Sequence, residues 1–328
     1  MRPKIYIEEG YLTDFNLKLQ EALKNHNVKK EKYNELLNRL KLEIVVSQGS
    51  AEVIFNGDPT KIKKIFKKDI NDIDSYEDLI LKQLMKKING FSSSSFENID
   101  SPALYLLNDH LDEVAKVEMD KNIYIKDLSS SFDEYVLPNS RVSLYIDASM
   151  NGIEKIAHRS QNVLIVDPYL FVDNHSDRYS KKIPNIAKTL KAFGLNNQNI
   201  KTHFSAVVAY GKETISLKNS IDELTKEMDN PNLTISVFAI PKKSKFGPFL
   251  GSNRYFLTDF CFGEYQHIFD RVGSVSANFF LDNINFDFKT LDYCKDEIIK
   301  RYNNEHLFNK KNQQKFGNIL KNPLFIED

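Results

Sequence analysis

Four polar side chains in the second half of the chain have the types and positions needed to bind a phosphate group. Ser252, Arg254 and Asp259 lie in the stretch GSNRYFLTDF, and Asp167 follows the apolar run VLIV. The planar guanidinium of an arginine can donate to two phosphate oxygens at once. Asp167 precedes a proline at the carboxyl end of an expected strand, where α/β folds place their sites. The pattern predicts a phosphate site, although both aspartates are equally typical of turns.

Ser252 stands where a cleaving site of this kind needs its nucleophile. An alcohol is a weak nucleophile without an adjacent base, and it does not accept and return a proton as imidazole does. The nearest histidine, His267, lies 15 residues further along the chain. We therefore predict binding without cleavage, with a rescued catalytic site around Arg254 and Asp259 as the alternative.

A basic and aromatic segment, PKKSKFGPFLGSNR, precedes the same stretch and contains Lys242, Lys243 and Lys245. Basic residues between aromatic ones are typical of contacts with single-stranded or backbone-tracked nucleic acid. The alternative is a solvated connection between two strands. Because 45 basic and 45 acidic residues cancel over the whole chain, any nucleic-acid binding has to come from such local patches.

The elements around these residues predict an α/β fold in two domains, each a mostly parallel sheet flanked by helices. In the second half, strands are expected at 163–171, 202–210, 233–240, 252–260 and 275–282, with helices near 183–194, 215–228 and 293–308. In the first half, strands are expected at 4–9, 103–109 and 122–125, and two strands joined by a turn within 43–58, with a polar loop around Ser92 to Ser95. A chain of 328 residues exceeds the usual size of a single core, so we set domains at 1–140 and 141–328.

Residues 141–328 resemble the phospholipase D superfamily, in particular bacterial phospholipase D-like domains of mobile and defence-associated gene clusters. Three segments carry the resemblance: VLIVDPYLF, SNRYFLTDF and GEYQHIFDRVGSVSANFFLD. The family motif is His-x-Lys, four residues, then Asp, and its positions correspond to Ser252, Arg254 and Asp259. In the family the His attacks phosphorus, the Lys neutralises phosphate oxygens and the Asp belongs to the hydrogen-bonded support.

This resemblance implies a phospholipase D-like module that binds nucleic acid and has lost its nucleophile. It further implies a component of an antiviral defence complex, and a homodimer or larger assembly, because a family site needs two copies of the motif. An active nuclease and a protein-binding scaffold are the other two hypotheses.

The first half has a weaker similarity, to PIN-type nucleases. Glu8 and Glu9 end the first expected strand, and Asp109 follows a later one. Acids at the carboxyl ends of a parallel sheet hold Mg²⁺ or Mn²⁺ in those enzymes. Otherwise Glu8 and Glu9 are surface residues and Asp109 caps a helix. Apart from this possible metal, the sequence predicts no cofactor.

Cysteine usage and the amino terminus point to the cytoplasm. Cys261 and Cys294 have no metal-ligand spacing, and two cysteines do not make a disulfide framework. Neither a signal peptide nor an apolar stretch of membrane-spanning length is apparent, so we expect no membrane partner.

Overall fold

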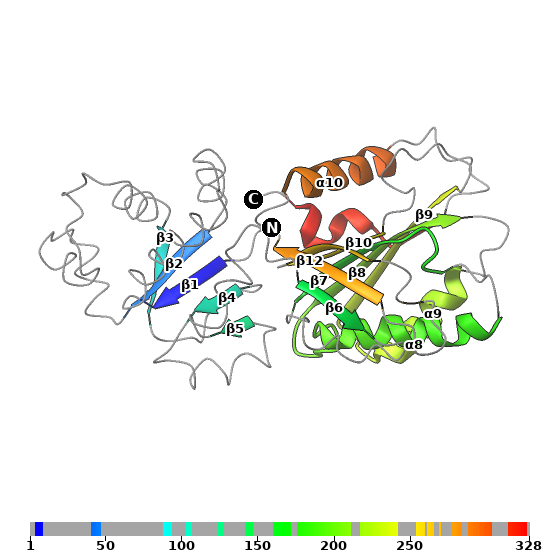
Figure 1. The fold of residues 1–328 in the computed structure, drawn as a ribbon, viewed down its shortest axis with the longest axis horizontal. Helices are drawn as coiled ribbons and strands as arrows, with labels where there is room; N and C mark the ends of the chain where they lie inside the picture. The colour runs from blue at the N-terminus through cyan, green and yellow to red at the C-terminus, as the bar shows by residue number, and fades with distance from the viewer. Residues whose placement is uncertain are drawn as a thin grey trace, which may run out of the picture. The chain divides into compact units, whose positions relative to one another are not determined.

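The computed structural model divides the chain into two compact units, residues 2–140 and residues 141–328 (Figure 1). In the first unit it describes the strands 4–8, 41–46, 88–93, 103–106 and 124–126. In the second unit it describes residues 142–146, 160–171, 176–210, 217–241, 254–259, 261–265, 269, 277–283, 288–303 and 314–326.

The described part of the first unit is a parallel sheet of five strands. These are β1 (Lys4–Glu8), β2 (Lys41–Val46), β3 (Ile88–Ser93), β4 (Ala103–Leu106) and β5 (Tyr124–Lys126). Their order is β3-β2-β1-β4-β5, and each of the four pairings is parallel. The chain thus builds outward from β1 to β3 and then returns to the other side of β1 with β4.

Strand β3 includes part of the segment expected as a polar loop. Ser92 and Ser93 pair with Val45 and Val46 of β2, at the edge of the sheet. An edge strand tolerates polar side chains because its backbone groups, not its side chains, form the ladder with its neighbour. The expected loop was therefore wrong at these two serines.

The second unit contains a mixed sheet of eight strands. These are β6 (Val142–Ile146), β7 (Asn162–Val166), β8 (Thr202–Tyr210), β9 (Leu233–Pro241), β10 (Arg254–Thr258), β11 (Cys261–Tyr265), β12 (Ala277–Asn283) and β13 (Gln314–Phe316). Their order is β13-β9-β8-β7-β10-β11-β12-β6. The chain is therefore an α/β protein, and β7 lies inside its sheet.

The expectation of a mostly parallel second sheet was wrong. Only β7, β8 and β9 pair in parallel, and the other five strands join the sheet through antiparallel pairings. The physical reason is clearest at β10 and β11, which are separated by Asp259 and Phe260 alone. A connection this short joins antiparallel neighbours, whereas parallel neighbours need a crossover of a dozen residues or more. Strand β11 itself was not expected from the sequence.

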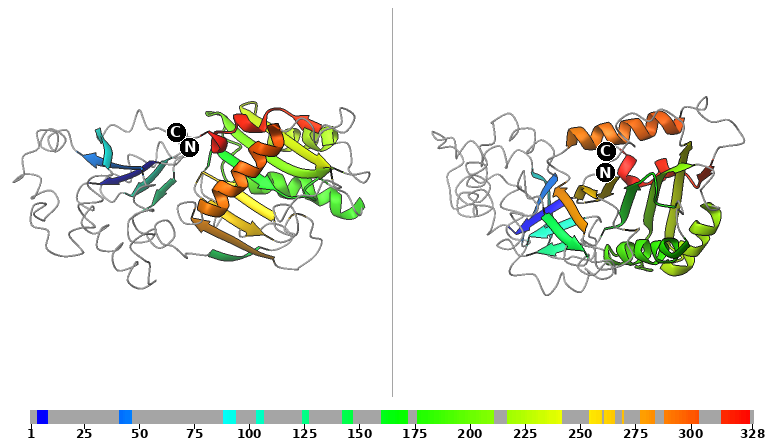
Figure 2. Two further views of the ribbon diagram at one scale, coloured as in Figure 1. Left: turned by 90° about the horizontal axis from the view of Figure 1, so that it is seen from above. Right: turned by 45° about the vertical axis from the view of Figure 1, so that its right-hand side comes forward.

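Helices cover both faces of this sheet, as the right-hand view of Figure 2 shows. Helices α8 (Ser176–Ala192) and α9 (Leu217–Met228) pack together on one face. Helix α10 (Phe288–Asn303) and the short 3₁₀ helices η6 (Ile319–Lys321) and η7 (Pro323–Phe325) lie on the other. Helix α8 ends where Gly194 adopts a φ of 84° and Leu195 N–H donates to the Leu190 carbonyl at 3.0 Å, the usual glycine-stabilised helix end.

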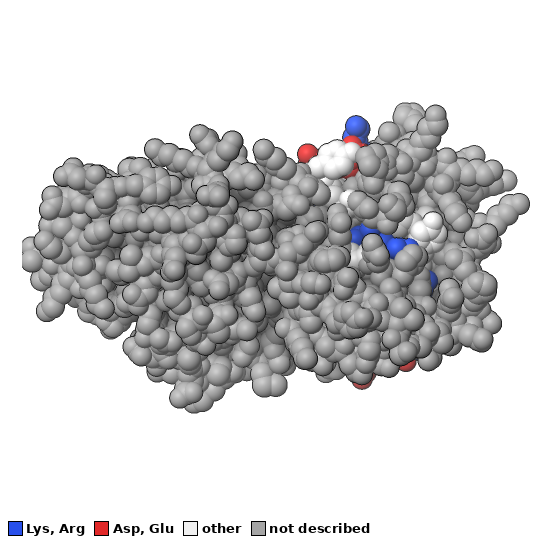
Figure 3. Space-filling view, viewed as in Figure 1, with Lys and Arg blue, Asp and Glu red and all other residues white. Residues whose placement is uncertain are grey.

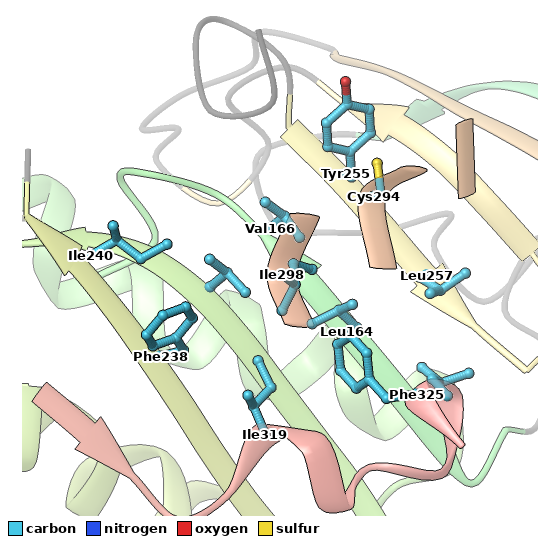
Figure 4. Packing of buried hydrophobic residues seen from close by; sticks show 12 residues of the cluster. Leu164, Val166, Phe238, Ile240, Tyr255, Leu257, Cys294, Ile298, Ile319 and Phe325 are labelled. Carbon is cyan, nitrogen blue, oxygen red and sulfur yellow. The ribbon is translucent and has the colours of Figure 1, made fainter. Parts of the chain in front are cut away.

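Successive apolar side chains of β7 point to opposite faces of the sheet and are buried on both faces. Leu164 and Val166 belong to the cluster beneath α10, η6 and η7, where Ile298, Ile319 and Phe325 converge on the sheet (Figure 4). Both strand faces are buried, since each of the five residues of β7 is buried. A strand buried on both faces is rigid, so groups at its two ends have well-defined positions.

Candidate functional site

The carboxyl end of β7 continues into a tight turn formed by Asp167, Pro168 and Tyr169. The Asp167 backbone N–H donates to the Val207 carbonyl of β8 at 3.0 Å, which extends the parallel ladder by one residue. The Asp167 side chain folds back, and its Oδ1 accepts from the Tyr169 backbone N–H at 2.8 Å. Such an Asx turn explains why an aspartate stands here. The carboxylate is held at the edge of the sheet and is only 4 % exposed.

Arg254 begins β10 and reaches the same carboxylate. Antiparallel pairing places Tyr255 opposite Val166, so Arg254 lies beside the residue that follows β7. Its Nε donates to Asp167 Oδ1 at 3.1 Å, and the arginine is 5 % exposed. On the far side, Arg254 pairs with Tyr265 of β11. The Tyr265 hydroxyl donates to Asp167 Oδ2 at 3.0 Å. Three strands thus contribute to one buried polar cluster.

Tyr169 and Lys182 extend this cluster toward α8. The guanidinium carbon of Arg254 lies 5.4 Å from the centroid of the Tyr169 ring, within the range of a cation–π contact. The Tyr169 carbonyl accepts from Lys182 Nζ at 2.7 Å, and Lys182 is 4 % exposed. We call the group of Asp167, Tyr169, Lys182, Arg254 and Tyr265 the β7 carboxyl-end cluster.

This cluster fixes the orientation of a guanidinium. The ion pair with Asp167 runs through Nε, one of the five donors that an arginine carries. A carboxylate that accepts from a backbone N–H, a guanidinium and a phenol is strongly held, which in turn restrains the Arg254 rotamer. The guanidinium is thus oriented at the end of the strand but is largely buried and charge-balanced by Asp167, and the pair contains no evident nucleophile.

Asp259 lies at the opposite end of β10 and does not join Arg254. Five residue steps along β10 separate Arg254 from Asp259, which is roughly 16 Å of extended chain. Asp259 Oδ2 accepts from the backbone N–H groups of Gln161 and Asn162 at 2.7 and 3.0 Å, and Oδ1 accepts from Asn162 Nδ2 at 2.8 Å. Asp259 therefore supports the start of β7, and the motif residues predicted from sequence do not converge on one point.

The environment of Asp259 is electrostatically unusual. It is 1 % exposed, and burial raises the pKa of its carboxyl to about 6, against the opposing effect of the bonds from Asn162 and Gln161. Beside it, the Oδ1 atom of Asn162 is buried without a hydrogen-bond partner. The desolvation of the carboxylate therefore raises the pKa by more than its three hydrogen bonds lower it.

His203 also lies away from Arg254. It pairs with Asn162 at the amino end of the parallel strands, whereas Arg254 lies at the carboxyl end of β7. Partial burial and the neighbouring Lys201 lower the pKa of His203 below its usual value. The structure therefore does not bring His203 and Arg254 together.

The remaining predicted site residues fall largely outside the described residues. These are Ser252, the basic residues Lys242, Lys243 and Lys245, and the acids Glu9 and Asp109. Glu8 is the last residue of β1, beside β2 and β4. Within the described ranges, no group of three His, Cys, Asp or Glu side chains could hold a metal ion.

Sequence reasoning missed Tyr265 and Lys182. Tyr265 was missed because the segment that begins GEY was expected to be a loop, although Phe262 and Tyr265 are residue types that favour strands. Lys182 precedes Ile183 and lies one turn before Ile186, both fully buried, so a lysine on the apolar side of α8 was the available signal. Tyr169 was quoted within the strand motif, but no role was inferred for it.

Positive charge in the described part of the second unit is local. On the face seen in Figure 3, described Lys and Arg side chains form one short run below α10, with others on α10 itself. Lys315 of β13, in the basic tail of the chain, donates to the Tyr302 carbonyl at 2.9 Å and lies 4.0 Å from the centroid of the Tyr302 ring. This lysine stabilises the packing of α10 on the sheet.

None of the helices in the described ranges is long and apolar enough to span a bilayer. Comparison with known proteins adds no assignment, since no protein-family model and no curated protein matches the chain.

Proposed function

We propose that the second unit binds the phosphate backbone of a nucleic acid at the β7 carboxyl-end cluster and does not cleave it. The observation that supports this proposal is the oriented guanidinium of Arg254, held by Asp167 beside the switch from parallel to antiparallel pairing. Binding sites of open α/β sheets lie at the carboxyl ends of strands where the strand order changes direction. The proposal keeps the phospholipase D-like reading of residues 141–328, with the antiviral role that the resemblance implies.

Absence of cleavage follows from the nucleophile position. In sequence, Ser252 lies two residues before Arg254, the oriented cation and the first residue of β10. A serine requires a base to attack phosphorus. His203 is at the other end of the parallel strands, and Asp259 is occupied by the start of β7. We therefore expect the purified protein to retain, not hydrolyse, a bound strand through this unit.

The variant Arg254→Ala tests the proposal. We expect it to weaken nucleic-acid binding by about 1–3 kcal/mol, because a charge-assisted phosphate contact is lost. Arg254→Lys keeps the charge without the planar fork, so its affinity for nucleic acid should lie between those of the wild type and Arg254→Ala. Arg301→Ala is the matched control, since Arg301 lies on α10 in an ion pair with Glu297 at 3.2 Å. Filter-binding titrations at several salt concentrations measure all four proteins.

Removal of Arg254 leaves the Asp167 charge buried, which can destabilise the fold by about 3–5 kcal/mol. The double variant Asp167→Asn/Arg254→Ala removes that charge, keeps one acceptor oxygen for the Tyr169 N–H and places an amide donor toward the Tyr265 hydroxyl, which can accept. It should unfold close to the wild-type temperature and still bind weakly. Wild-type affinity in this folded double variant would contradict a phosphate contact at Arg254.

A second candidate function, metal-dependent cleavage, is favoured by the topology of the first unit. Its parallel order β3-β2-β1-β4-β5 reverses between β1 and β4, and Glu8 ends β1 at that point. Glu9 directly follows β1 in the sequence and Asp109 follows β4 by three residues, but both lie outside the described residues. Carboxylates at such a switch point are suited to Mg²⁺ or Mn²⁺. Cleavage with either ion, abolished by EDTA and by Glu8→Gln, would support this candidate; equal cleavage by the Glu8→Gln protein would exclude Glu8 from it.

We further propose a homodimer or a larger complex, because the chain has one copy of a motif that the family uses in pairs. Light scattering after size exclusion would give twice the chain mass of 38.0 kDa for a dimer. A monomer at all concentrations would leave the larger complex as the form to seek by co-purification.

A further inference from the structure

We infer that the nucleic acid bound at the β7 carboxyl-end cluster is single-stranded and that Tyr169 stacks on one of its bases. This inference rests on the proposed function, since it adds a base contact to the phosphate contact of Arg254. It assigns a binding role to an aromatic residue of the turn after β7.

Tyr169 is held by its backbone on both sides. Its N–H donates to Asp167 Oδ1 at 2.8 Å, and its carbonyl accepts from Lys182 Nζ at 2.7 Å. Both partners are buried, with exposures of 4 % each. The Cα–Cβ direction of Tyr169 is thereby set by the same carboxylate that orients Arg254. An aromatic ring on a restrained backbone loses little conformational entropy when a ligand binds.

Exposure distinguishes Tyr169 from the other aromatic residues described around this cluster. Tyr265 and Phe269 pack edge to face at 5.4 Å and are 2 % and 1 % exposed. Phe171, two residues after Tyr169, is fully buried. Tyr169 is partly exposed, although both of its backbone polar groups are engaged. Among these described aromatic residues, Tyr169 is therefore the one with surface open to a ligand.

The neighbouring charge selects the kind of ligand. The Arg254 guanidinium carbon is 5.4 Å from the ring centroid, so a largely buried cation, 5 % exposed, lies beside a partly exposed aromatic residue. A nucleotide offers the complementary pair, a phosphate beside a flat base. In a duplex the base is stacked between its neighbours, whereas in a single strand it is free to stack on an aromatic side chain. Ring and guanidinium together thus favour a single strand, of DNA or RNA.

The test compares single-stranded and duplex oligonucleotides of about 16 nucleotides, the upper site size of one single-strand-binding fold. Fluorescence anisotropy with the full chain should show at least about tenfold tighter binding of the single strand. Tyr169→Ala should weaken single-strand binding roughly 5- to 100-fold and change duplex binding little. Tyr169→Phe, which keeps the ring, should stay within about twofold. Tyr293→Ala is the matched control, because Tyr293 lies on α10 with 49 % exposure.

Each other outcome has a distinct meaning. If the wild-type protein binds neither form, the proposed function itself fails. If it binds both forms equally and Tyr169→Ala behaves as Tyr293→Ala, binding stands and the stacking inference is overturned. A loss in Tyr169→Phe as large as in Tyr169→Ala would overturn stacking too, because the hydroxyl would then carry the contact. Tyr169→Trp, with a larger ring, should bind the single strand at least as well as the wild type, even if the alanine variant does not fold.

Discussion

Two buried aspartates in the second unit have opposite electrostatic settings. Asp167 accepts from a guanidinium, a phenol and a backbone N–H, so its charge is compensated by a cation. Asp259 accepts from two backbone N–H groups and an amide, and none of these three donors carries a charge. The first carboxylate orients an arginine, and the second holds the start of a strand at an electrostatic cost.

That cost predicts a pH dependence of stability. The pKa of Asp259 is about 6 in the folded protein and about 3.9 in an unfolded chain. Because the folded pKa is the higher one, its stabilising contribution is fully present below pH about 4 and is lost as the pH rises through about 6. Over this window the free energy of unfolding should fall by roughly 2–3 kcal/mol through this group.

Urea unfolding of the wild type and of Asp259→Asn at several pH values between these limits measures the effect. At low pH the asparagine variant should be about as stable as the wild type, because an amide, like a protonated carboxyl, keeps one acceptor oxygen for the N–H groups of Gln161 and Asn162. It should lack the part of the slope that Asp259 contributes. Parallel pH profiles for the two proteins would show that Asp259 does not titrate in this window.

Among the elements, β13 and the two 3₁₀ helices depend on a backbone conformation that suits glycine. Gly317 has a φ of 67°, and a Cβ there would lie 2.7 Å from Ser236 Oγ and 3.2 Å from the Ile235 carbonyl oxygen. Beyond Gly317, Asn318 caps η6 and Asn322 caps η7. The Asn322 amide also donates to Ser205 Oγ of β8 at 3.0 Å, which fastens this segment to the sheet.

We therefore predict that Gly317→Ala destabilises the second unit by about 1–3 kcal/mol, through strain in the left-handed region and the contact with Ser236. Thermal unfolding followed by circular dichroism measures the change. The double variant Ser236→Ala/Gly317→Ala removes the Oγ contact and should recover part of the loss. No recovery would assign the whole effect to the backbone or to the Ile235 carbonyl.

At the scale of the whole molecule, the two units have separate sheets and separate candidate activities. The first unit has a five-stranded parallel sheet, and the second an eight-stranded mixed sheet with helices on both faces. Binding is proposed for the second unit and metal-dependent cleavage, as the other candidate, for the first. The two candidates therefore separate when the chain is divided.

A protein of residues 141–328 alone should fold cooperatively and keep nucleic-acid binding that depends on Arg254. It should lack any cleavage that depends on Glu8. Denaturant unfolding and the same binding titrations, with the full chain as the reference, measure both properties. Binding that disappears in a folded 141–328 protein would move the nucleic-acid site to residues 2–140.

The local pattern of apolar residues was sufficient to predict most of the helices and strands of the second unit. The apolar runs at β7, β8 and β9 predicted buried strands, because a strand covered on both faces has no polar alternation. The apolar spacing of α9 likewise predicted its helix, with Leu217, Leu224 and Met228 buried. These features depend on residues close together in the chain, and the amino-acid order therefore determined them.

Partnership between distant residues was decided only by the tertiary structure. The sequence placed Arg254 and Asp259 in one motif, yet an extended strand carries them to opposite ends of the sheet. Arg254 meets Asp167, 87 positions away, because β10 pairs antiparallel with β7. Asp259 meets Asn162 for the same reason, 97 positions away. Strand register is set by the burial of whole faces and by the length of the connections, and no short stretch of residues contains that information.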